Sequence, residues 1–454
     1  MSNLIREWNP ENENFWDSKG KAIARKNLWI SIPSLFLSFA LWMVWSVVVV
    51  KLPTIGFDLT TDQLFWLAAL PGLSGATLRV VYSFMIPIWG GRLWTTVTTF
   101  SLLIPAVGMG LAVQDLSTPY EVFLMLAILS GFGGGNFASS MANIAYFYPK
   151  KEKGHALALN AGLGNLGVSA VQFLVPIVIT LGFLEVATGN AQTTNDGSSM
   201  WLQNAAFFWI PFVVISGLFA WFGMNDINGI KSSFKSQSVI FKRRHNWIMC
   251  VLYVGTFGSF IGFSAAFPLL AKSQFPEVNS LQLAFLGPLV GALSRALSGK
   301  MCDRIGGGKI TLAVFVAMLL GTLMLIYFLS IREASYAFYG FFGSFILLFI
   351  ATGVGNASTF QMIPTIFWKD CSLRMKGQSE DLVKKASETE SAATIGFTSA
   401  LGAYGAFFIP KTFGFSLSET GEAYLALILF SVYYALCILI TWVCYLRKDS
   451  QYKC

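Results

Sequence analysis

Apolar residues follow one another in long stretches along this chain, and short polar connections separate these stretches. A helix of about 20 residues crosses a hydrocarbon core about 30 Å thick, and each stretch is close to this length or longer. Twelve transmembrane helices are predicted, at residues 28–50, 64–87, 94–113, 122–147, 156–183, 203–223, 248–271, 280–298, 310–330, 336–362, 391–413 and 424–445. The pattern therefore predicts an all-α integral membrane protein.

The composition supports this class and excludes others. Of the 454 residues, 55% are apolar and 12% are charged, whereas a soluble globular domain carries about 25% charged residues. A disordered chain, a coiled coil and an ordinary cytosolic enzyme are excluded by these values. We interpret the net charge of +8 as an indication of membrane topology and not of nucleic-acid binding, because no module that binds DNA or RNA is visible. No nucleic-acid partner is expected.

The basic residues indicate how the spans are oriented, since Lys and Arg are retained on the cytoplasmic side. If both termini are cytoplasmic, the inside segments hold 25 of the 31 basic residues. The outside loops then hold only Lys51, Lys272, Arg332 and Lys411. We therefore expect a multi-pass protein of the bacterial cytoplasmic (inner) membrane, with both termini in the cytoplasm.

Cysteine and histidine give no sign of a disulfide or a metal site. With this topology, three of the six cysteines fall inside spans and three on the cytoplasmic side, where thiols stay reduced. His155 and His245 are the two histidines, and both lie at predicted span edges, where solvated side chains are expected. No metal ion and no cofactor are expected.

Internal repeats indicate that the chain contains one six-helix unit twice. The segment 73–79 reads LSGATLR and the segment 289–295 reads LVGALSR, an offset of 216 residues. GGGN at 133–136 matches GVGN at 353–356, an offset of 220. We predict an N-terminal tail at 1–27, a first half at 28–224, a linker at 225–246, a second half at 247–445 and a C-terminal tail at 446–454. Two pseudo-twofold related halves of this kind describe the major facilitator fold, in which substrate binds near the bilayer midplane.

A connection between two predicted spans supports the same fold. The sequence GKMCDRIGGGK at 299–309 resembles the loop signature of the major facilitators, with Gly299, Asp303 and Arg304 at signature positions. In that superfamily the loop is thought to latch the two halves on the cytoplasmic side. The corresponding loop of the first half keeps Gly90, Gly91 and Arg92 but lacks the acidic residue.

Two arginines are the charged residues that remain inside the predicted spans, away from their edges. They are Arg79 and Arg295, and they occupy equivalent positions of the repeat. An arginine at the centre of a bilayer costs about 2.5–3.5 kcal/mol even on the most lenient scale, and no intramembrane carboxylate is available to offset this. Because a guanidinium directs two parallel N–H groups at one anion, two arginines at the pseudo-twofold axis predict a site for a small oxyanion.

Aromatic and glycine residues set the expected size of this site. Phe137 follows the GGGN segment, and Tyr253 and Phe257 are four residues apart, so they share one face of a helix. Glycines recur in the fifth and eleventh spans, where they permit close packing of helices and a narrow cavity. These glycines are Gly162, Gly164, Gly167, Gly396, Gly402 and Gly405.

The chain resembles the nitrate/nitrite porter family, the NarK-type members of the major facilitators. The segment AGLGNLGV at 161–168 is similar to the first nitrate signature of that family, and GFTSALGAYGAFFIP at 396–410 is similar to the second. Ala406 departs from the family pattern, which usually has a second glycine there. The resemblance implies that Arg79 and Arg295 coordinate the anion, that Phe137, Tyr253 and Phe257 enclose it, and that Asn165 is a polar contact or a gating residue.

These observations favour a secondary transporter that exchanges nitrate for nitrite. Proton relays in transporters use Asp, Glu or His inside the membrane, and the predicted spans hold none away from their edges. The alternatives are proton-coupled nitrate symport and exchange of another small inorganic anion. An enzyme is not expected, because no nucleophile with a nearby base and no phosphate loop is visible. A monomer is expected. For the tail, which holds Trp8, Phe15 and Trp16, association with the inner leaflet and disorder both remain open.

Overall fold

A computed structural model describes residues 3–182, 185–228 and 238–454. Within these ranges twelve helices or joined pairs of helices are long and apolar enough to cross a membrane, so the predicted all-α membrane fold with twelve spans is confirmed. Of the predicted linker 225–246, residues 229–237 lie outside the described residues. The chain divides into two compact units, Met1–Ser232 with Ser264–Phe285, and Ser233–Phe263 with Leu286–Cys454.

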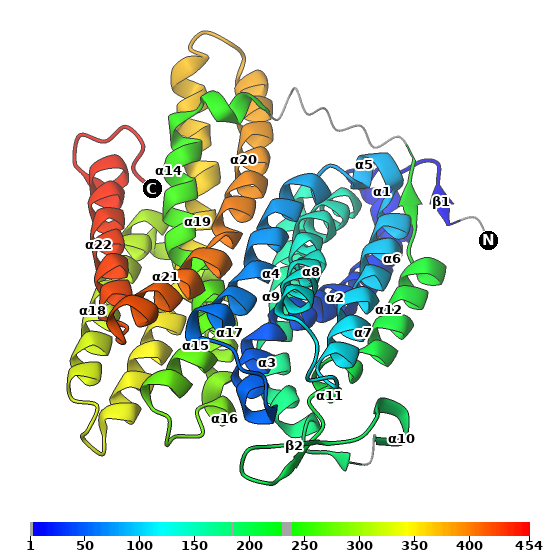
Figure 1. The fold of residues 1–454 in the computed structure, drawn as a ribbon. Coiled ribbons are helices and arrows are strands. Elements are labelled where there is room, and N and C mark those ends of the chain that lie inside the picture. Colours follow the sequence, from blue (N-terminus) through cyan, green and yellow to red (C-terminus); the bar gives the residue numbers. More distant parts are fainter. Residues whose placement is uncertain (1–2, 183–184, 229–237) are drawn as a thin grey trace. The chain divides into compact units, whose positions relative to one another are not determined.

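The first unit contains the helices of the first half of the chain (Figure 1). Its principal helices are α2 (Lys21–Met43), α3 (Trp45–Lys51), α4 (Thr61–Tyr82), α6 (Gly91–Ser101), α7 (Leu103–Ala112), α8 (Tyr120–Phe147), α9 (Lys150–Val178) and α12 (Ile210–Gly223). Short helices are α1 (Glu13–Phe15), a π-helical turn (Trp16–Gly20), a 3-10 turn (Leu52–Ile55), α5 (Ile86–Trp89), α10 (Glu185–Thr188), α11 (Asn204–Phe207) and α16 (Leu281–Ala284).

Two small strand pairs complete the first unit. β1 (Leu4–Ile5) pairs in parallel with β4 (Asp226–Ile227). β2 (Gln192–Thr193) pairs antiparallel with β3 (Ser199–Met200). The first pair joins segments more than 220 residues apart, so it fixes the N-terminal segment to the residues that follow α12.

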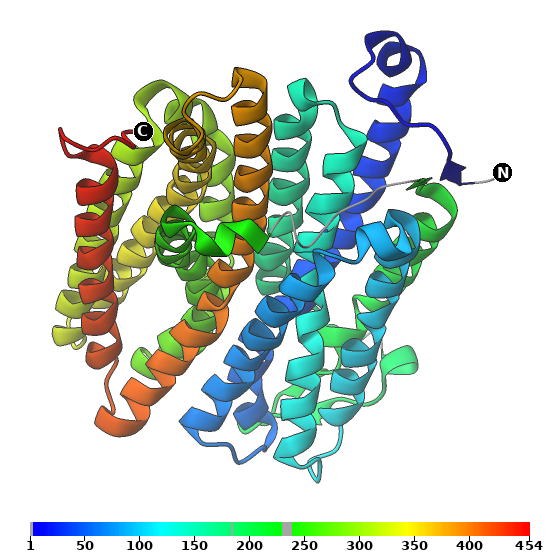
Figure 2. The same cartoon turned by 90° about the horizontal axis from the view of Figure 1, so that it is seen from above.

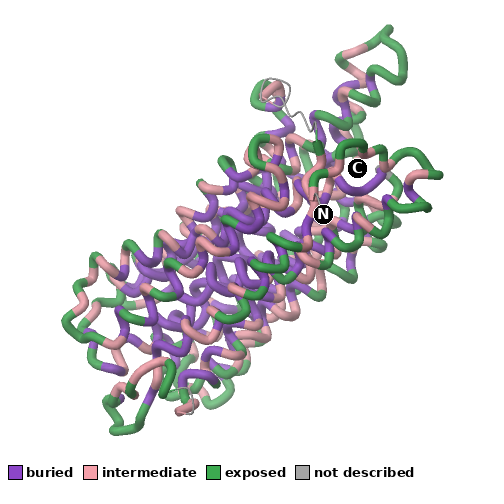
Figure 3. Tube along the Cα trace, turned by 90° about the vertical axis from the view of Figure 1, so that its right-hand side faces the viewer, coloured by how far each residue is buried: buried purple, intermediate pink, exposed green. Residues whose placement is uncertain are grey.

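The second unit is also helical (Figure 1 and Figure 2). Its elements are a 3-10 turn (Ser238–Lys242), α14 (Arg244–Tyr253), a π-helical turn (Val254–Gly258), α17 (Leu286–Ile305), α18 (Gly307–Ser330), α19 (Ala337–Arg374), α20 (Glu380–Ala403), α21 (Gly405–Thr420), α22 (Tyr424–Thr441) and a final π-helical turn (Trp442–Leu446). The helix α15 (Ser259–Gln274) contributes its first residues to this unit and the remainder to the first. Exposed residues lie at the connections and also along the helices, where they alternate with buried ones (Figure 3).

Glycines of the repeated segments bring equivalent helices close together in each unit. In the first unit, a Cβ atom on Gly75 of α4 would come within 3.0 Å of the Gly134 Cα on α8. In the second, a Cβ atom on Gly353 of α19 would collide with the backbone oxygen of Gly291 on α17. Because only glycine permits this approach, the repeated small residues determine where α4 crosses α8 and where α17 crosses α19.

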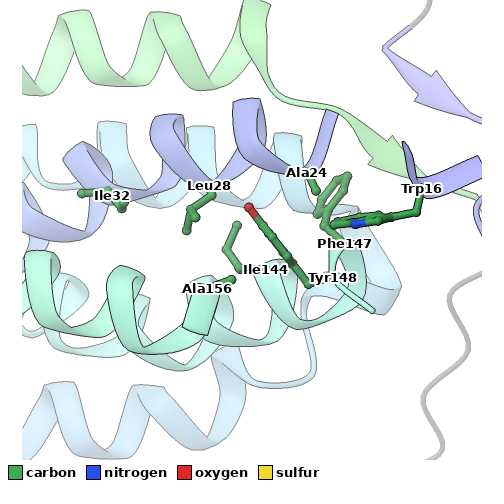
Figure 4. Close-up of a cluster of buried hydrophobic side chains, with 8 residues drawn as sticks. All are labelled: Trp16, Ala24, Leu28, Ile32, Ile144, Phe147, Tyr148 and Ala156. Carbon is green, nitrogen blue, oxygen red and sulfur yellow. The ribbon is translucent and has the colours of Figure 1, made fainter. Parts of the chain in front are cut away.

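The N-terminal segment is ordered against the first unit. Trp16 belongs to a buried apolar cluster with residues of α2, α8 and α9 (Figure 4); the others are Ala24, Leu28, Ile32, Ile144, Phe147, Tyr148 and Ala156. The indole Nε1 of Trp8 donates to the backbone oxygen of Tyr146 at 3.1 Å. Of the two possibilities left open by the sequence, disorder therefore does not apply to the described part of this segment. The first long helix also begins at Lys21, within the predicted tail 1–27.

Candidate functional site

Arg79 lies on α4 and is buried, with 1% of its surface exposed. Its Nε donates to the backbone oxygen of Gly134 on α8 at 2.9 Å. The guanidinium carbon lies 4.7 Å from the ring centroid of Phe137 and 5.2 Å from that of Trp42. A cation over an aromatic face is attracted by the negative charge density of the ring, so these two rings favour a charged group at this place.

Neighbouring contacts hold the Arg79 environment in place. The indole Nε1 of Trp42, on α2, donates to the backbone oxygen of Pro71 on α4 at 2.6 Å. The amide of Asn136 donates to the hydroxyl of Ser38 at 2.8 Å and so ties α8 to α2 directly beside Phe137. Trp42 was not identified from the sequence.

A small polar cavity lies beside Asn136. It has a volume of about 10 Å³ and is lined mainly by hydroxyl groups of α2, α6 and α8; the lining residues include Ser31, Ser34, Ser38, Thr95 and Thr98. A space of this size holds about one water molecule. The amide oxygen of Asn136 is buried and has no hydrogen-bond partner among the described residues, so it is an acceptor for such a water.

Arg295 lies on α17 in the second unit, at the repeat position equivalent to Arg79. Its side chain is half-buried, and its guanidinium carbon lies 5.6 Å from the ring centroid of Phe360 on α19. The Nη1 atom is buried and has no hydrogen-bond partner within the described part of the chain. Burial of a charged donor without an acceptor is costly, which favours an anion as its missing partner.

Three stacked rings accompany Arg295. Tyr253 lies parallel to Phe360, with 4.4 Å between their centroids and an interplanar angle of 11°. On its other side it stacks on Phe257, with 5.4 Å between centroids and an angle of 14°. Tyr253 and Phe257 are both buried. Phe360, which was not identified from the sequence, thus lies between Arg295 and Tyr253, and Phe257 contacts Tyr253.

The glycines of the second signature have different surroundings. A Cβ atom on Gly402 would lie 2.6 Å from Tyr253 Cδ1, and one on Gly405 would collide with the backbone of Gly258. A Cβ on Gly396 would meet nothing within 4 Å. Ala406 is fully buried, so a methyl group is accommodated where the family usually has glycine. Gly402 thus leaves room for the Tyr253 ring and Gly405 for the backbone of Gly258, whereas Gly396 shows no such constraint.

The first signature lies on α9 and packs against α2. A Cβ atom on Gly164 would lie 2.6 Å from Leu35 Cγ, and one on Gly167 would collide with the backbone oxygen of Phe36. Gly162 has open space around it. Asn165 is 1% exposed, and its amide oxygen is buried without a hydrogen-bond partner among the described residues. Other buried amides, among them Asn136 and Asn160, have the same feature, so the role of Asn165 as a polar contact or a gating residue stays a prediction.

The predicted latch residues lie at the end of α17 and in the turn after it. Gly299 is half-exposed, and Asp303 and Arg304 are exposed on the last turns of the helix. The turn itself is made by Gly306, whose φ of +100° is a conformation that other residues rarely adopt. Their role as a latch stays a prediction.

The corresponding turn in the first unit obtains its acidic partner from elsewhere in the chain. Gly90 adopts a φ of +82°, and the backbone N–H of Arg92 donates to Asp226 Oδ1 at 2.8 Å. The Nε of Arg92 lies 3.2 Å from Asp226 Oδ2. The acidic residue that the loop itself lacks is thus supplied by β4.

The structure tests the expectation that both histidines are solvated. His155 is exposed as expected, but the expectation for His245 is wrong: it is 8% exposed, and its Nδ1 lies 3.1 Å from the hydroxyl of Tyr445. The expectation failed because α22 and the C-terminal segment cover this helix end.

Glu390 is also buried, directly before the predicted span 391–413, and Arg243 and Arg374 both contact its carboxylate, at 2.9 Å and 2.8 Å.

Comparisons with known proteins bear on the identity of the fold and of the transported ion. A family model described as Major Facilitator Superfamily matches residues 34–379. The solved structure of a mutant of the nucleoside transporter NupG resembles this chain with a TM-score of 0.60 at 12% identity, and the match covers 92% of this chain and 99% of that one. At this identity the likeness concerns the fold alone.

Relatives of much higher identity extend over nearly the whole chain. The nitrate/nitrite transporter NarU of Salmonella typhimurium is 49% identical over 450 residues, which are 99% of this chain and 97% of the relative. NarU of Escherichia coli is also 49% identical, over 453 residues, with 99% and 98% covered. The probable nitrate/nitrite antiporter NarK2 of Thermus thermophilus is 40% identical over 459 residues, with 99% and 98% covered.

Proposed function

The chain belongs to the Major Facilitator Superfamily as a nitrate/nitrite porter of the NarK type, and on this basis we propose that it exchanges nitrate for nitrite by alternating access. It is a transporter and not an enzyme, since its family and its full-length relatives are transporters. We place it in the bacterial cytoplasmic membrane as a monomer with both termini inside, which agrees with the distribution of its basic residues.

One observation carries the proposal. Arginine occurs at both equivalent positions of the repeat, and in each unit the guanidinium lies over an aromatic ring of the helix packed against its own, Phe137 for Arg79 and Phe360 for Arg295. Rings on one side of a planar cation leave its N–H edge for a planar oxyanion. In a major facilitator the substrate binds where the two repeats face each other, so the proposed anion lies between Arg79 and Arg295.

The mechanism follows from charge. Without a bound anion, two positive charges facing each other repel, and the repulsion is strong in a site with little water. Nitrate or nitrite supplies the negative charge that lets both arginines approach. The occupied carrier therefore changes between inward-open and outward-open states more readily than the empty one, and transport in one direction requires a return anion.

The surroundings support exchange over proton symport. The buried carboxylate of Glu390 is bound by two arginines, and Arg374 also contacts Asp370 at 2.7 Å. Each of these carboxylates therefore already has a cationic partner. A proton carrier that cycles between states needs a carboxylate or imidazole on the transport path.

The test uses purified protein in liposomes that contain nitrite, nitrate or an inert anion, with nitrate uptake followed at equal pH and with acid outside. We expect uptake only when nitrate or nitrite is inside, and no response to the proton gradient. Uptake into liposomes without internal nitrate or nitrite, driven by acid outside, would show symport instead and would overturn the exchange proposal.

A further inference from the structure

The first turns of α2 carry a basic surface that the transport mechanism does not use. Lys21, Arg25 and Trp29 are four residues apart and thus share one face of the helix, and Lys26 lies beside them. These side chains are exposed, Trp29 by 49%. They line a surface hollow of about 530 Å³, whose other lining residues are Asp17 and Ala22. We call this open surface the α2 basic hollow; all of its lining residues lie between Asp17 and Trp29.

The packing of the N-terminal segment leaves the basic face of α2 exposed. Trp16 packs into the buried cluster shown in Figure 4, and its Nε1 donates to Glu152 Oε1 at 3.0 Å. Ala24 and Leu28, on a different face of α2, belong to the same cluster. The aromatic residues of the segment are thus used in packing. The face with Arg25 and Lys26 is not covered by this cluster and is exposed at the surface of the unit.

The charges of the hollow are only partly balanced by the protein. Lys21 lies 3.6 Å from Glu152, with 59% of its side chain exposed. Arg25 and Lys26 form no ion pair with any described residue, and no acidic residue occurs three or four positions from either along the helix. Asp17 is the one acidic residue of the lining, against three basic ones. The hollow therefore carries a net positive charge that favours an anion.

A second basic pair shows what an ordinary solvated pair looks like in this protein. Lys384 and Lys385 are exposed on the first turns of α20. They follow Glu380 and Asp381 by four residues, the spacing at which opposite charges neighbour each other on a helix. No tryptophan lies near them in the sequence. The α2 basic hollow differs in both respects.

We propose that the α2 basic hollow binds the phosphate headgroup of an anionic phospholipid. Arginine and lysine bind phosphate oxygens by charge-assisted hydrogen bonds, and tryptophan prefers the level of the headgroups, where its ring contacts the upper acyl chain. Basic clusters at the start of a span recognise anionic lipids of the cytoplasmic leaflet. The proposal rests on the inside-positive orientation given above, but not on the transported ion or on the mode of exchange.

The test is native mass spectrometry of the full-length protein, released from nanodiscs that contain equal parts of phosphatidylglycerol and phosphatidylcholine. We expect wild-type protein to retain phosphatidylglycerol selectively. The Arg25→Gln/Lys26→Gln variant should bind it about thirtyfold more weakly, from the attraction of two basic residues to an anionic leaflet. The control variant Lys384→Gln/Lys385→Gln removes the same charge and should bind phosphatidylglycerol as wild type does.

Several outcomes would overturn the proposal. They are equal retention of both lipids, an equal loss in the control variant, and displacement of the lipid by millimolar inorganic phosphate, which would indicate a soluble anion as the ligand. If the double variant does not fold, the single variants Lys26→Gln and Trp29→Leu provide the same comparison, because both side chains are exposed. Transport activity is not the readout, so failure here leaves the proposed exchange untouched.

Discussion

The guanidinium carbon of Arg295 lies 5.6 Å from the ring centroid of Phe360, and Phe360 stacks on Tyr253. In the first unit the ring over Arg79 belongs to Phe137, at 4.7 Å. The repeat offset of 220 residues relates Phe137 to Ala357, not to Phe360, which lies one helical turn later. The two units therefore place an aromatic ring over an equivalent arginine from non-equivalent positions.

The first prediction concerns Phe360. The substitution Phe360→Leu removes the ring from Arg295 and from Tyr253 while it keeps an apolar side chain. We expect nitrate binding to weaken by about 1–2 kcal/mol, from the lost cation–π and stacking contributions. Isothermal titration with nitrate checks this. Phe415→Leu, a substitution of a phenylalanine that is 51% exposed in the same unit, serves as the control, and an equal effect of both would rule out a specific role for Phe360.

The second prediction concerns the two arginines. We expect Arg79→Lys and Arg295→Lys each to abolish nitrate exchange, because an ammonium group does not reproduce the two parallel N–H groups of a guanidinium. The loss of one hydrogen bond between a charged side chain and the anion should weaken anion binding by about 1.5–3 kcal/mol. Exchange in nitrite-loaded liposomes is the measurement. Arg332→Lys, at an exposed residue paired with Glu422, should exchange normally. Normal exchange by either intramembrane variant would contradict the two-arginine site.

The two arginines of the proposed site could be selected from the sequence, because the apolar spans make any charge inside them conspicuous. The twelve spans and the family follow from local patterns and a near-regular repeat. Phe360 and Trp42 did not follow, since the chain holds 41 phenylalanines and 14 tryptophans. Which ring faces an arginine depends on the rotation of each helix, which sequence spacing alone does not give.

Other features depended on contacts between distant parts of the chain. Asp226 meets Arg92 because β4 pairs with β1 at the N-terminus, and no local pattern indicates this pairing. Burial of His245 depends on the C-terminal segment, which contributes Tyr445 and Tyr452 to its surroundings. Tertiary contacts of this kind bring residues together at helix ends, where hydropathy is least informative.

The third prediction concerns the ion pair of Arg92 and Asp226. Their side chains are 25% and 17% exposed, so water screens the pair partially. We expect Asp226→Asn to lower the stability of the first unit by about 1 kcal/mol, since charge is lost while one hydrogen-bond acceptor remains. Thermal unfolding in detergent measures the change. Asp449→Asn breaks the exposed pair with Arg447 and should leave the unfolding temperature unchanged; an equal shift would show that the Arg92 pair has no special role.

The fourth prediction concerns pH and the β2–β3 hairpin. The hydroxyl of Thr194, followed by the backbone N–H and hydroxyl of Ser198, lowers the pKa of Asp196 to about 2. Because this pKa lies below its ordinary value, the stabilisation is complete above about pH 4 and is lost as the pH falls toward 2. The backbone N–H of Asn195 donates to the backbone oxygen of Thr54. This hydrogen bond between the hairpin and the turn at 52–55 should therefore also break at low pH.

Hydrogen exchange of the hairpin amides, corrected for the intrinsic effect of pH, measures this loss. The variant Asp196→Asn should exchange rapidly at every pH and show no transition. The control variant Asp115→Asn removes a carboxylate in another loop, where the backbone N–H of Ser117 donates to it. This variant should keep the pH transition of the hairpin. A hairpin that stays protected at pH 2 would contradict the role given to Asp196.

The fifth prediction concerns Glu390 and separates exchange from proton symport. Arg243 donates to both of its carboxylate oxygens, at 2.9 Å and 3.0 Å, and Arg374 donates to one of them. Removal of one partner from such a buried group leaves uncompensated charge and costs about 3 kcal/mol. We expect Glu390→Gln to lower the unfolding temperature but to keep the requirement for internal nitrate or nitrite. The matched control Glu388→Gln, at an exposed position two residues earlier, should change neither.

A proton carrier at Glu390 would behave differently. Wild-type uptake would then respond to acid outside, and Glu390→Gln would lose this response while it still bound nitrate. If Glu390→Gln is too unstable to reconstitute, Asp370→Asn tests the same network, since Arg374 contacts both carboxylates and retains Glu390. Uptake of labelled nitrate at equal and unequal pH distinguishes these cases. A structural role predicts that every folded variant needs a return anion, because the charge that permits the conformational change is carried by the substrate.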